Sequence, residues 1–141
     1  MLRRWRSPPD GSCFFHSIAR QTGQTAKSLR ERCAMDTLRR QDNVLNGLPL
    51  KKWIDYEYNE TPEQYASEMR RGRWAGVLEM KLLADYFNRP VVVYAHLQTG
   101  HAKRVLIVEP EQPEAHSCAR PLFLLYVSGN HYDALELPKM R

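Results

Sequence analysis

Cys13 is the side chain best placed for nucleophilic chemistry. It lies in the run Asp-Gly-Ser-Cys-Phe-Phe-His of residues 10–16. Pro8-Pro9 and Asp10-Gly11 predict a turn, and residues 13–20 contain no Gly or Pro and favour a helix. A helix N-terminus favours an anion, and thiols in such places can ionise with pKa values of about 3.5–7.5. Cys13 is therefore a candidate nucleophile, preceded by a turn that could offer backbone N–H groups to an oxyanion.

A nucleophilic thiol needs a base, and His131 has the most favourable setting of the five histidines. It follows a Ser-Gly-Asn turn at the start of a predicted strand, and Asp133 comes two residues later. Alternate residues of a strand point to one face, so Asp133 could orient the imidazole. We expect His16 to pack against its surroundings and the remaining histidines to be solvated or in loops. The residues thus predict a thiol–imidazole–carboxylate site.

The other two cysteines form no disulfide or metal pattern. Cys33 lies within a predicted helix and should be a small core residue, whereas Cys118 lies in a polar loop two residues after His116. A zinc site needs more clustered ligands than this pair, so we expect no metal and no cofactor. Three thiols without a pairing pattern indicate a reducing compartment. The expected location is the cytoplasm, or a host cell's cytosol if the source is a virus or a bacterium.

Composition indicates one globular domain with a basic surface. Hydrophobic residues make up 43% and charged residues 26% of the 141 residues, which excludes wholesale disorder. No apolar run approaches the ~20 residues that span a bilayer, and no signal peptide is recognisable. The net charge is +5, but aromatic residues are not interleaved with the arginine clusters, so we expect no nucleic-acid site. An acidic stretch between Asp55 and Glu68 could receive a basic partner.

The elements that must position the site divide into helices and then strands. Helices are predicted over residues 13–20, from Thr25 through residue 38, from Thr61 to Gly72, and over 75–87. The third begins with Thr-Pro-Glu-Gln, a capping box with proline at the first helical position. Strands are predicted over 91–94, 103–108, 122–127 and 131–135, with loops at 43–49 and 109–120. This order predicts an α+β fold with helices flanking a small, mainly antiparallel sheet.

Three segments resemble motifs of the OTU (ovarian tumour) cysteine proteases. The run Asp-Gly-Ser-Cys-Phe-Phe-His-Ser at 10–17 is similar to the family's nucleophile motif, and Gly-Asn-His-Tyr-Asp-Ala-Leu at 129–135 is similar to its histidine motif. Between them, residues 74–79 and 82–84 resemble its central Trp-Gly helix segment. The resemblance runs from about residue 9 to 137. It implies a papain-type fold in one near-minimal catalytic domain, residues 1–141, with little chain before the nucleophile motif.

The resemblance implies a deubiquitinase that cleaves isopeptide bonds after the C-terminal glycine of ubiquitin. By position, Cys13 would be the nucleophile and His131 the general base. Asp133 aligns with the residue that orients the histidine in many members, and Asp10 aligns with the leading Asp of the motif, which has an active-site role in some. The backbone of Asp10 to Cys13, with Gly11 and Ser12, would form the oxyanion hole. Tyr132 would help to wall the channel for the substrate tail.

Several choices stay open at this point. The third residue of the site could be Asp133 or Asp10, and the substrate could be ubiquitin, polyubiquitin or a ubiquitin-like protein. A catalytically silent OTU-like module that binds ubiquitin is an alternative, as is an unrelated thiol hydrolase acting on a small amide. We expect a monomer with no nucleic-acid partner and no membrane association.

Overall fold

The computed structural model describes residues 2–96, 100–111, 120–127 and 131–137. Five helices occupy the first two thirds of the chain: α1 (Cys13–Thr22), α2 (Ala26–Arg39), α3 (Leu50–Tyr58), α4 (Pro62–Arg71) and α5 (Val77–Phe87). Two short strands, β2 (Val44–Leu45) and β3 (Leu48–Pro49), form a small hairpin before α3. The predicted turn at 128–130, and His116 and Cys118, lie outside the described residues.

The main sheet has five strands in the order β1-β7-β6-β4-β5. The strands are β1 (Arg3–Trp5), β4 (Val91–His96), β5 (Ala102–Val108), β6 (Leu122–Val127) and β7 (His131–Glu136). Every pairing is antiparallel except that of β4 with β6, which is parallel. The expected α+β arrangement with a mainly antiparallel sheet is confirmed.

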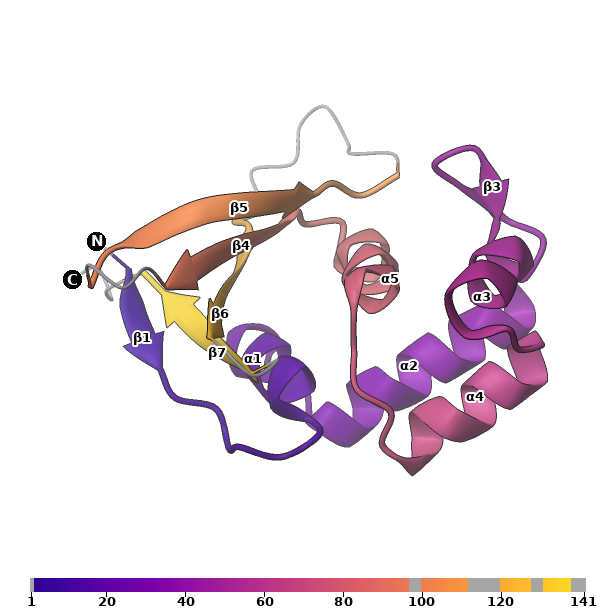
Figure 1. Ribbon diagram of the computed structural model, residues 1–141, viewed down its shortest axis with the longest axis horizontal. Coiled ribbons are helices and arrows are strands. Elements are labelled where there is room, and N and C mark those ends of the chain that lie inside the picture. The colour runs from indigo at the N-terminus through magenta and orange to yellow at the C-terminus, as the bar shows by residue number, and fades with distance from the viewer. Residues whose placement is uncertain (1, 97–99, 112–119, 128–130, 138–141) are drawn as a thin grey trace.

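The helices lie on one side of the sheet and extend away from it (Figure 1). α1 packs against β6 and β7, α5 contacts β4 and β5, and α2 packs along α4. The buried core includes Phe15 and Ile18 of α1, Ile54 of α3 and Tyr65 of α4, each 0% exposed. Cys33 is also 0% exposed, so its predicted place in the core is confirmed. Full burial of one such large apolar side chain contributes about 1.5–3 kcal/mol to stability, so Phe15 and Ile18 stabilise the packing of α1 in the core.

Local signals account for the best-predicted helix boundary. Thr61 Oγ1 accepts a hydrogen bond from the Gln64 amide at 3.2 Å, and Gln64 Oε1 accepts one from the Thr61 amide at 2.9 Å. Pro62 occupies the first helical position, and Gly72 ends α4 with a φ of 119°, a left-handed conformation that glycine adopts without strain. The predicted capping box is therefore confirmed.

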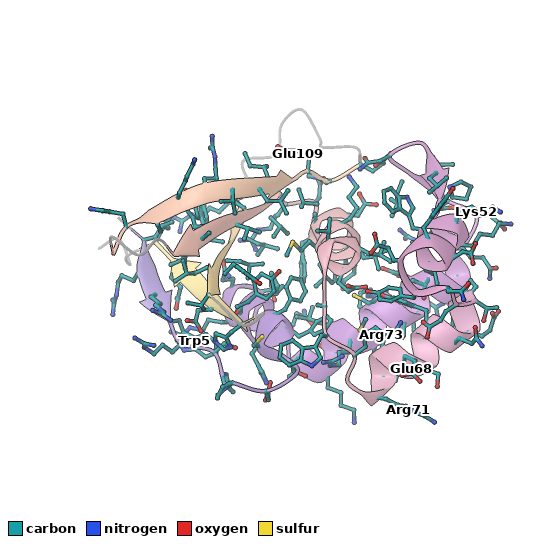
Figure 2. All side chains as sticks on the ribbon, viewed as in Figure 1. Trp5, Lys52, Glu68, Arg71, Arg73 and Glu109 are labelled. Atoms are coloured by element: carbon teal, nitrogen blue, oxygen red, sulfur yellow. The ribbon has the colours of Figure 1, made fainter. Side chains whose placement is uncertain are left out.

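Three elements were not predicted from the sequence. The hairpin β2–β3 lies in the segment expected to be a loop, and α3 follows it where no helix was assigned. α3 is held by tertiary contacts: Leu50 and Ile54 are buried, and Trp53 Nε1 donates to the Leu45 carbonyl at 2.7 Å. The third is β1, which pairs with β7 at the sheet edge, with Trp5 beside α1 (Figure 2). In the described part of the chain, no helix has the length and apolarity needed to cross a membrane.

Candidate active site

Cys13 is the first residue of α1, at the end of a tight turn. The Ser12 amide donates to Asp10 Oδ1 at 2.8 Å, and the Cys13 amide donates to the Asp10 carbonyl at 3.2 Å. The Asp10 side chain thus closes the turn that places the cysteine at the start of the helix. Cys13 itself is only 2% exposed. Its thiol therefore sits within the protein at a helix N-terminus, where the backbone favours negative charge.

The thiol lies against the first residues of β7, although the two are far apart in the sequence. The Tyr132 amide donates to Cys13 Sγ at 3.4 Å. Ser17, one turn along α1, donates through Oγ to the Cys13 carbonyl at 2.9 Å and to the Tyr132 carbonyl at 3.2 Å. These bonds fix the start of α1 against β7.

His131 and Asp133 form a hydrogen-bonded pair on β7. His131 Nε2 lies 2.7 Å from Asp133 Oδ1, and the side chains are 23% and 1% exposed respectively. The strand alternation expected from the sequence brings the two to the same face. With Nε2 occupied by the carboxylate, Nδ1 is the ring nitrogen that remains to exchange a proton with a neighbouring group.

Asp133 has two further partners in the N-terminal segment, Arg4 and Ser7. The Ser7 amide donates to Oδ1 at 2.8 Å, while Arg4 Nε and Nη2 lie 2.8 and 2.7 Å from Oδ2. Burial alone would raise the pKa of Asp133, but the hydrogen bonds from Ser7, His131 and Arg4 outweigh it and lower that pKa below its usual value. Asp133 is therefore an anion at neutral pH. Neither Arg4 nor Ser7 was identified from the sequence, because no motif links them to residue 133.

Asp10 occupies a different place. Its side chain is 53% exposed, and its carboxylate contacts the Ser12 amide and, at 3.3 Å, His16 Nε2. The structure therefore brings Asp133, and not Asp10, to the ring of His131. Asp10 shapes the turn before the cysteine instead.

The predicted oxyanion turn has its amides engaged within the turn. The Ser12 amide is bound to the Asp10 side chain and the Cys13 amide to the Asp10 carbonyl. The second bond is at the long end of the N–H···O range. For either amide to bind a substrate oxygen, it must exchange its present acceptor for that oxygen. The turn has the groups needed for an oxyanion hole, in a conformation that does not yet present them.

Arg30 of α2 holds the same turn from its other side. Its Nη2 donates to the Gly11 carbonyl and to Ser12 Oγ, both at 2.9 Å, and its Nη1 donates to the carbonyls of Met69 and Arg73 at 3.0 and 2.8 Å. Arg30 is 6% exposed, and burial lowers the pKa of its guanidinium, although nearby acidic groups oppose that effect. In a trans peptide, the N–H points opposite to the C=O, so fixing the Gly11 carbonyl fixes the direction of the Ser12 amide. Sequence reasoning missed this residue.

The segment before α5 borders the turn. A Cβ added at Gly11 would lie 3.4 Å from the Gly72 carbonyl and 3.5 Å from Trp74 Nε1. This segment is anchored by Glu79, whose carboxylate accepts from the Gly76 amide and the Tyr65 hydroxyl, both at 2.6 Å. Burial raises the pKa of Glu79, with these hydrogen bonds opposing the rise. Such an anchored segment fits the scaffold role expected of residues 74–79.

Tyr132 follows His131 and is half-buried. Its ring makes edge contacts with Phe14 at 5.8 Å and Tyr126 at 5.2 Å between ring centres. Burial raises the pKa of its hydroxyl, with Tyr126 adding to the rise. The side chain thus has a packed aromatic setting beside the thiol, and its role as a channel wall stays a prediction.

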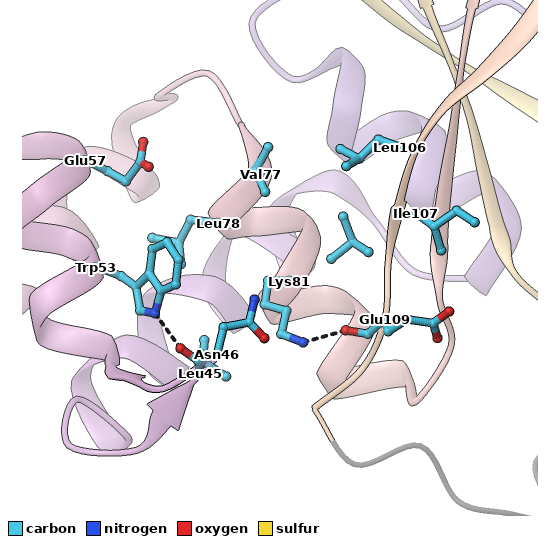
Figure 3. Close-up of a pocket in the computed structure, with 11 residues that line it drawn as sticks. Leu45, Asn46, Trp53, Glu57, Val77, Leu78, Lys81, Leu106, Ile107 and Glu109 are labelled. Carbon is cyan, nitrogen blue, oxygen red and sulfur yellow. Dashed lines mark hydrogen bonds between the residues drawn. The ribbon is translucent and has the colours of Figure 1, made fainter.

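Two other surface features lie apart from the thiol. A cavity of about 360 Å³ between α3, the start of α5 and the end of β5 is lined by residues that include Trp53, Val77 and Lys81 but none of the predicted site residues (Figure 3). The acidic stretch is partly neutralised. Glu60, just before α4, pairs with Arg73. Glu68 pairs with Arg71 near the end of α4 (Figure 2). Among the described residues, no cluster of three or more potential metal ligands occurs.

Comparisons with known proteins agree with this geometry. The family of OTU-like cysteine proteases matches residues 8–132 of the chain. A comparison with curated protein sequences finds no significant match.

Solved structures share the fold at low sequence identity. The viral OTU domain protease from Dera Ghazi Khan virus has a TM-score of 0.75 at 18% identity, covering 98% of this chain and 82% of that one. The OTU deubiquitinase from Wolbachia pipientis wMel bound to ubiquitin has a TM-score of 0.66 at 18% identity, covering 95% and 94%. The Hazara virus OTU bound to ubiquitin has a TM-score of 0.64 at 19% identity, covering 99% and 83%.

Proposed function

We propose, from the premise that this chain belongs to the family of OTU-like cysteine proteases, that it is a deubiquitinase. It would cleave the isopeptide bond after the C-terminal glycine of ubiquitin or of a ubiquitin-like protein. The observation that carries the proposal is the contact of the Cys13 thiol with β7, next to a His131–Asp133 pair held at 2.7 Å. The ubiquitin-bound structures of the Wolbachia and Hazara virus proteins, which share the fold, support the choice of substrate.

The proposed reaction begins when His131 takes the proton of the Cys13 thiol. The thiolate adds to the carbonyl carbon of the terminal glycine, and the carbonyl oxygen becomes an oxyanion. The amides of Ser12 and Cys13 are the nearest candidates to bind this oxyanion, after releasing Asp10. Asp133 stabilises the imidazolium and keeps its Nδ1 directed at the reacting atoms.

Collapse of the first intermediate breaks the C–N bond and forms a thioester on Cys13. His131 gives its proton to the departing lysine amine, which leaves as a neutral amine and is protonated by solvent. The neutral imidazole then takes a proton from water, and the resulting hydroxide adds to the thioester carbonyl. Loss of the thiolate releases a carboxylic acid, which gives its proton to solvent, and the His131 imidazolium returns its proton to the thiolate, which restores the enzyme.

The finer parts of the proposal concern partners and location. We propose that polyubiquitin chains are substrates and that the protein acts as a monomer in a reducing compartment such as the cytoplasm. The odd number of cysteines and the lack of a disulfide spacing pattern in the sequence support such a compartment.

A ubiquitin carrying a C-terminal electrophile tests the proposed function. Wild-type protein should gain the mass of one ubiquitin, and Cys13→Ala should gain none. Absence of an adduct on the intact, folded wild-type protein would refute the proposed activity. Binding of unmodified ubiquitin without an adduct would instead favour the silent binding module, and reaction with a small thiol-reactive amide alone would favour an unrelated thiol hydrolase.

A further inference from the structure

The inference begins with the environment of Asp133, the carboxylate beside His131. Both of its oxygens are occupied: Oδ1 by His131 Nε2 at 2.7 Å and the Ser7 amide at 2.8 Å, and Oδ2 by Arg4. The Asp133 side chain is 1% exposed, so these protein groups replace the water that would otherwise solvate it. A buried carboxylate needs such compensation to stay charged.

Arg4 contacts Asp133 through two nitrogens at once. Nε and Nη2 lie 2.8 and 2.7 Å from Oδ2. The χ2 torsion of an aspartate, which rotates the carboxylate group, has only weak preferences. A carboxylate without other partners can therefore rotate away from the imidazole. The planar guanidinium presents its donors in a rigid fork, and a lysine ammonium cannot reproduce that geometry. With Arg4 on one oxygen and Ser7 on the other, the carboxylate is fixed with Oδ1 toward His131.

The fold supplies Arg4 through a strand that spans the site. β1 pairs antiparallel with β7, with Arg4 opposite Leu135 and Trp5 opposite Ala134. The diagonal neighbour two residues along the partner strand is within reach of a long side chain on the same face, and here that neighbour is Asp133. The same segment continues to Ser7, whose Oγ donates to the Cys13 carbonyl at 2.9 Å. Residues 3–7 therefore bridge the elements that carry the thiol and the imidazole.

We propose that Arg4 is a positioning residue: it holds Asp133 in the orientation that directs His131 at Cys13. The inference rests on the proposed thiol chemistry but not on the identity of the substrate. Within the described residues, Arg4 has hydrogen bonds to Asp133, which in turn contacts His131, so we expect Arg4 to act through Asp133. Loss of the two guanidinium contacts with Asp133 should lower the rate of the chemical step and leave substrate binding unchanged.

The test uses Arg4→Ala, Arg4→Gln and Arg4→Lys in the full chain, with a fluorogenic amide of ubiquitin as substrate. We expect Arg4→Ala and Arg4→Gln to lower kcat by about 10- to 100-fold with KM nearly unchanged, as for loss of other residues that orient a functional side chain. Arg4→Lys should keep part of the rate, since it retains the charge without the fork. Arg3→Ala is the matched control, because it removes the same charge from an exposed neighbour that strand alternation turns to the opposite face.

Chemical rescue separates positioning from a general structural role. Guanidinium at a few tens of millimolar, far below denaturing concentrations, should restore much of the kcat of Arg4→Ala but not of Arg4→Gln, whose side chain fills the space. Tetramethylammonium, a cation without donors, should restore neither. If Arg4→Ala is unfolded at the assay temperature by circular dichroism, Arg4→Gln decides. Wild-type kcat in a folded Arg4→Gln, or no rescue of a folded Arg4→Ala, would overturn the proposal.

A second readout does not depend on ubiquitin. The rate at which iodoacetamide alkylates Cys13, followed by mass spectrometry at that site, reports thiolate reactivity directly. It should fall in Arg4→Ala and recover with guanidinium. If this pattern appears while wild-type protein cleaves no ubiquitin substrate, the proposed substrate is wrong and the role of Arg4 stands. An alkylation rate that is the same in wild type and Arg4→Ala would count against the role of Arg4, whatever the substrate.

Discussion

Replacing Arg30 by lysine should weaken both the fold and the oxyanion turn. The guanidinium reaches two sides at once: Gly11 and Ser12 in the turn, and the carbonyls of Met69 and Arg73 near the end of α4. A lysine ammonium is a single point of charge and can serve only one side. The Arg30→Lys variant should therefore have about two fewer hydrogen bonds from a charged donor than wild type.

The magnitude follows from these contacts. Hydrogen bonds to charged groups contribute about 1.5–3 kcal/mol each, so the loss of about two should lower the free energy of unfolding by roughly 3–6 kcal/mol. That is a large share of the roughly 5–15 kcal/mol that stabilises a typical domain. Removal of a whole oxyanion donor costs ~10²–10³ in kcat, and here the Ser12 amide is displaced and not deleted. We therefore expect kcat to fall by about 10- to 100-fold, with KM little changed.

Urea unfolding and steady-state turnover on the same preparations measure both effects. The matched control is Arg70→Lys, whose bidentate pair with Glu31 at 2.8 Å is exposed and should contribute less than about 1 kcal/mol. If Arg30→Lys matches the control in stability, the bridging role of the guanidinium is wrong. If it is destabilised but turns over normally where it is folded, Arg30 holds the fold and does not set the turn.

Four further variants test the remaining assignments. Asp10→Ala should retain most of the wild-type kcat, whereas Asp133→Ala should lose far more, because Asp133 and not Asp10 contacts His131. If turnover assays give the reverse order, Asp10 is the residue that orients His131. Asp133→Asn should be less stable than wild type at neutral pH. The pKa of Asp133 is lower in the folded protein than its unfolded value of about 3.9. Its contribution to the free energy of unfolding is therefore present above the unfolded pKa and is lost as the pH falls through the folded pKa. The stabilities of the two proteins should therefore converge as the pH falls below about 4. The pKa of Glu79 is higher in the folded protein than in the unfolded chain. Its contribution to the free energy of unfolding is therefore present below about pH 4.3 and is lost as the pH rises through the folded pKa. Urea unfolding should thus show wild type losing more stability than Glu79→Gln as the pH rises from 4 to 7, and parallel losses would contradict this.

Parts of the fold that depend on neighbouring residues could be predicted from the sequence. The Thr61–Gln64 capping box and the strand at 131–135 rest on signals within a few residues, and both are present in the structure. The same holds for the pairing of His131 with Asp133, which needs only the alternation of a strand.

The parts that could not be predicted depend on distant partners. β1 is a three-residue strand with no periodicity of its own, and it exists because β7 offers an edge. Arg4 meets Asp133 across 129 positions of sequence, and Arg30 meets Arg73 across 43. A single arginine in a basic sequence carries no sign of such a partner. From composition alone these arginines resemble those of a solvated basic surface, whereas tertiary structure places the guanidinium groups of Arg4 and Arg30 beside the site.

The pairing of β1 with β7 also has a consequence for biosynthesis. The groups around the thiol come from residues 4–13 and 131–133, so the ribosome must make both before they can meet. Contacts of such long sequence separation form late and make folding slower. A nascent chain would thus carry its cysteine without the histidine and aspartate until β7 has been synthesised. Proteolytic activity would begin only when the last strand leaves the ribosome and takes its place in the sheet, so synthesis itself delays the enzyme until the domain is whole.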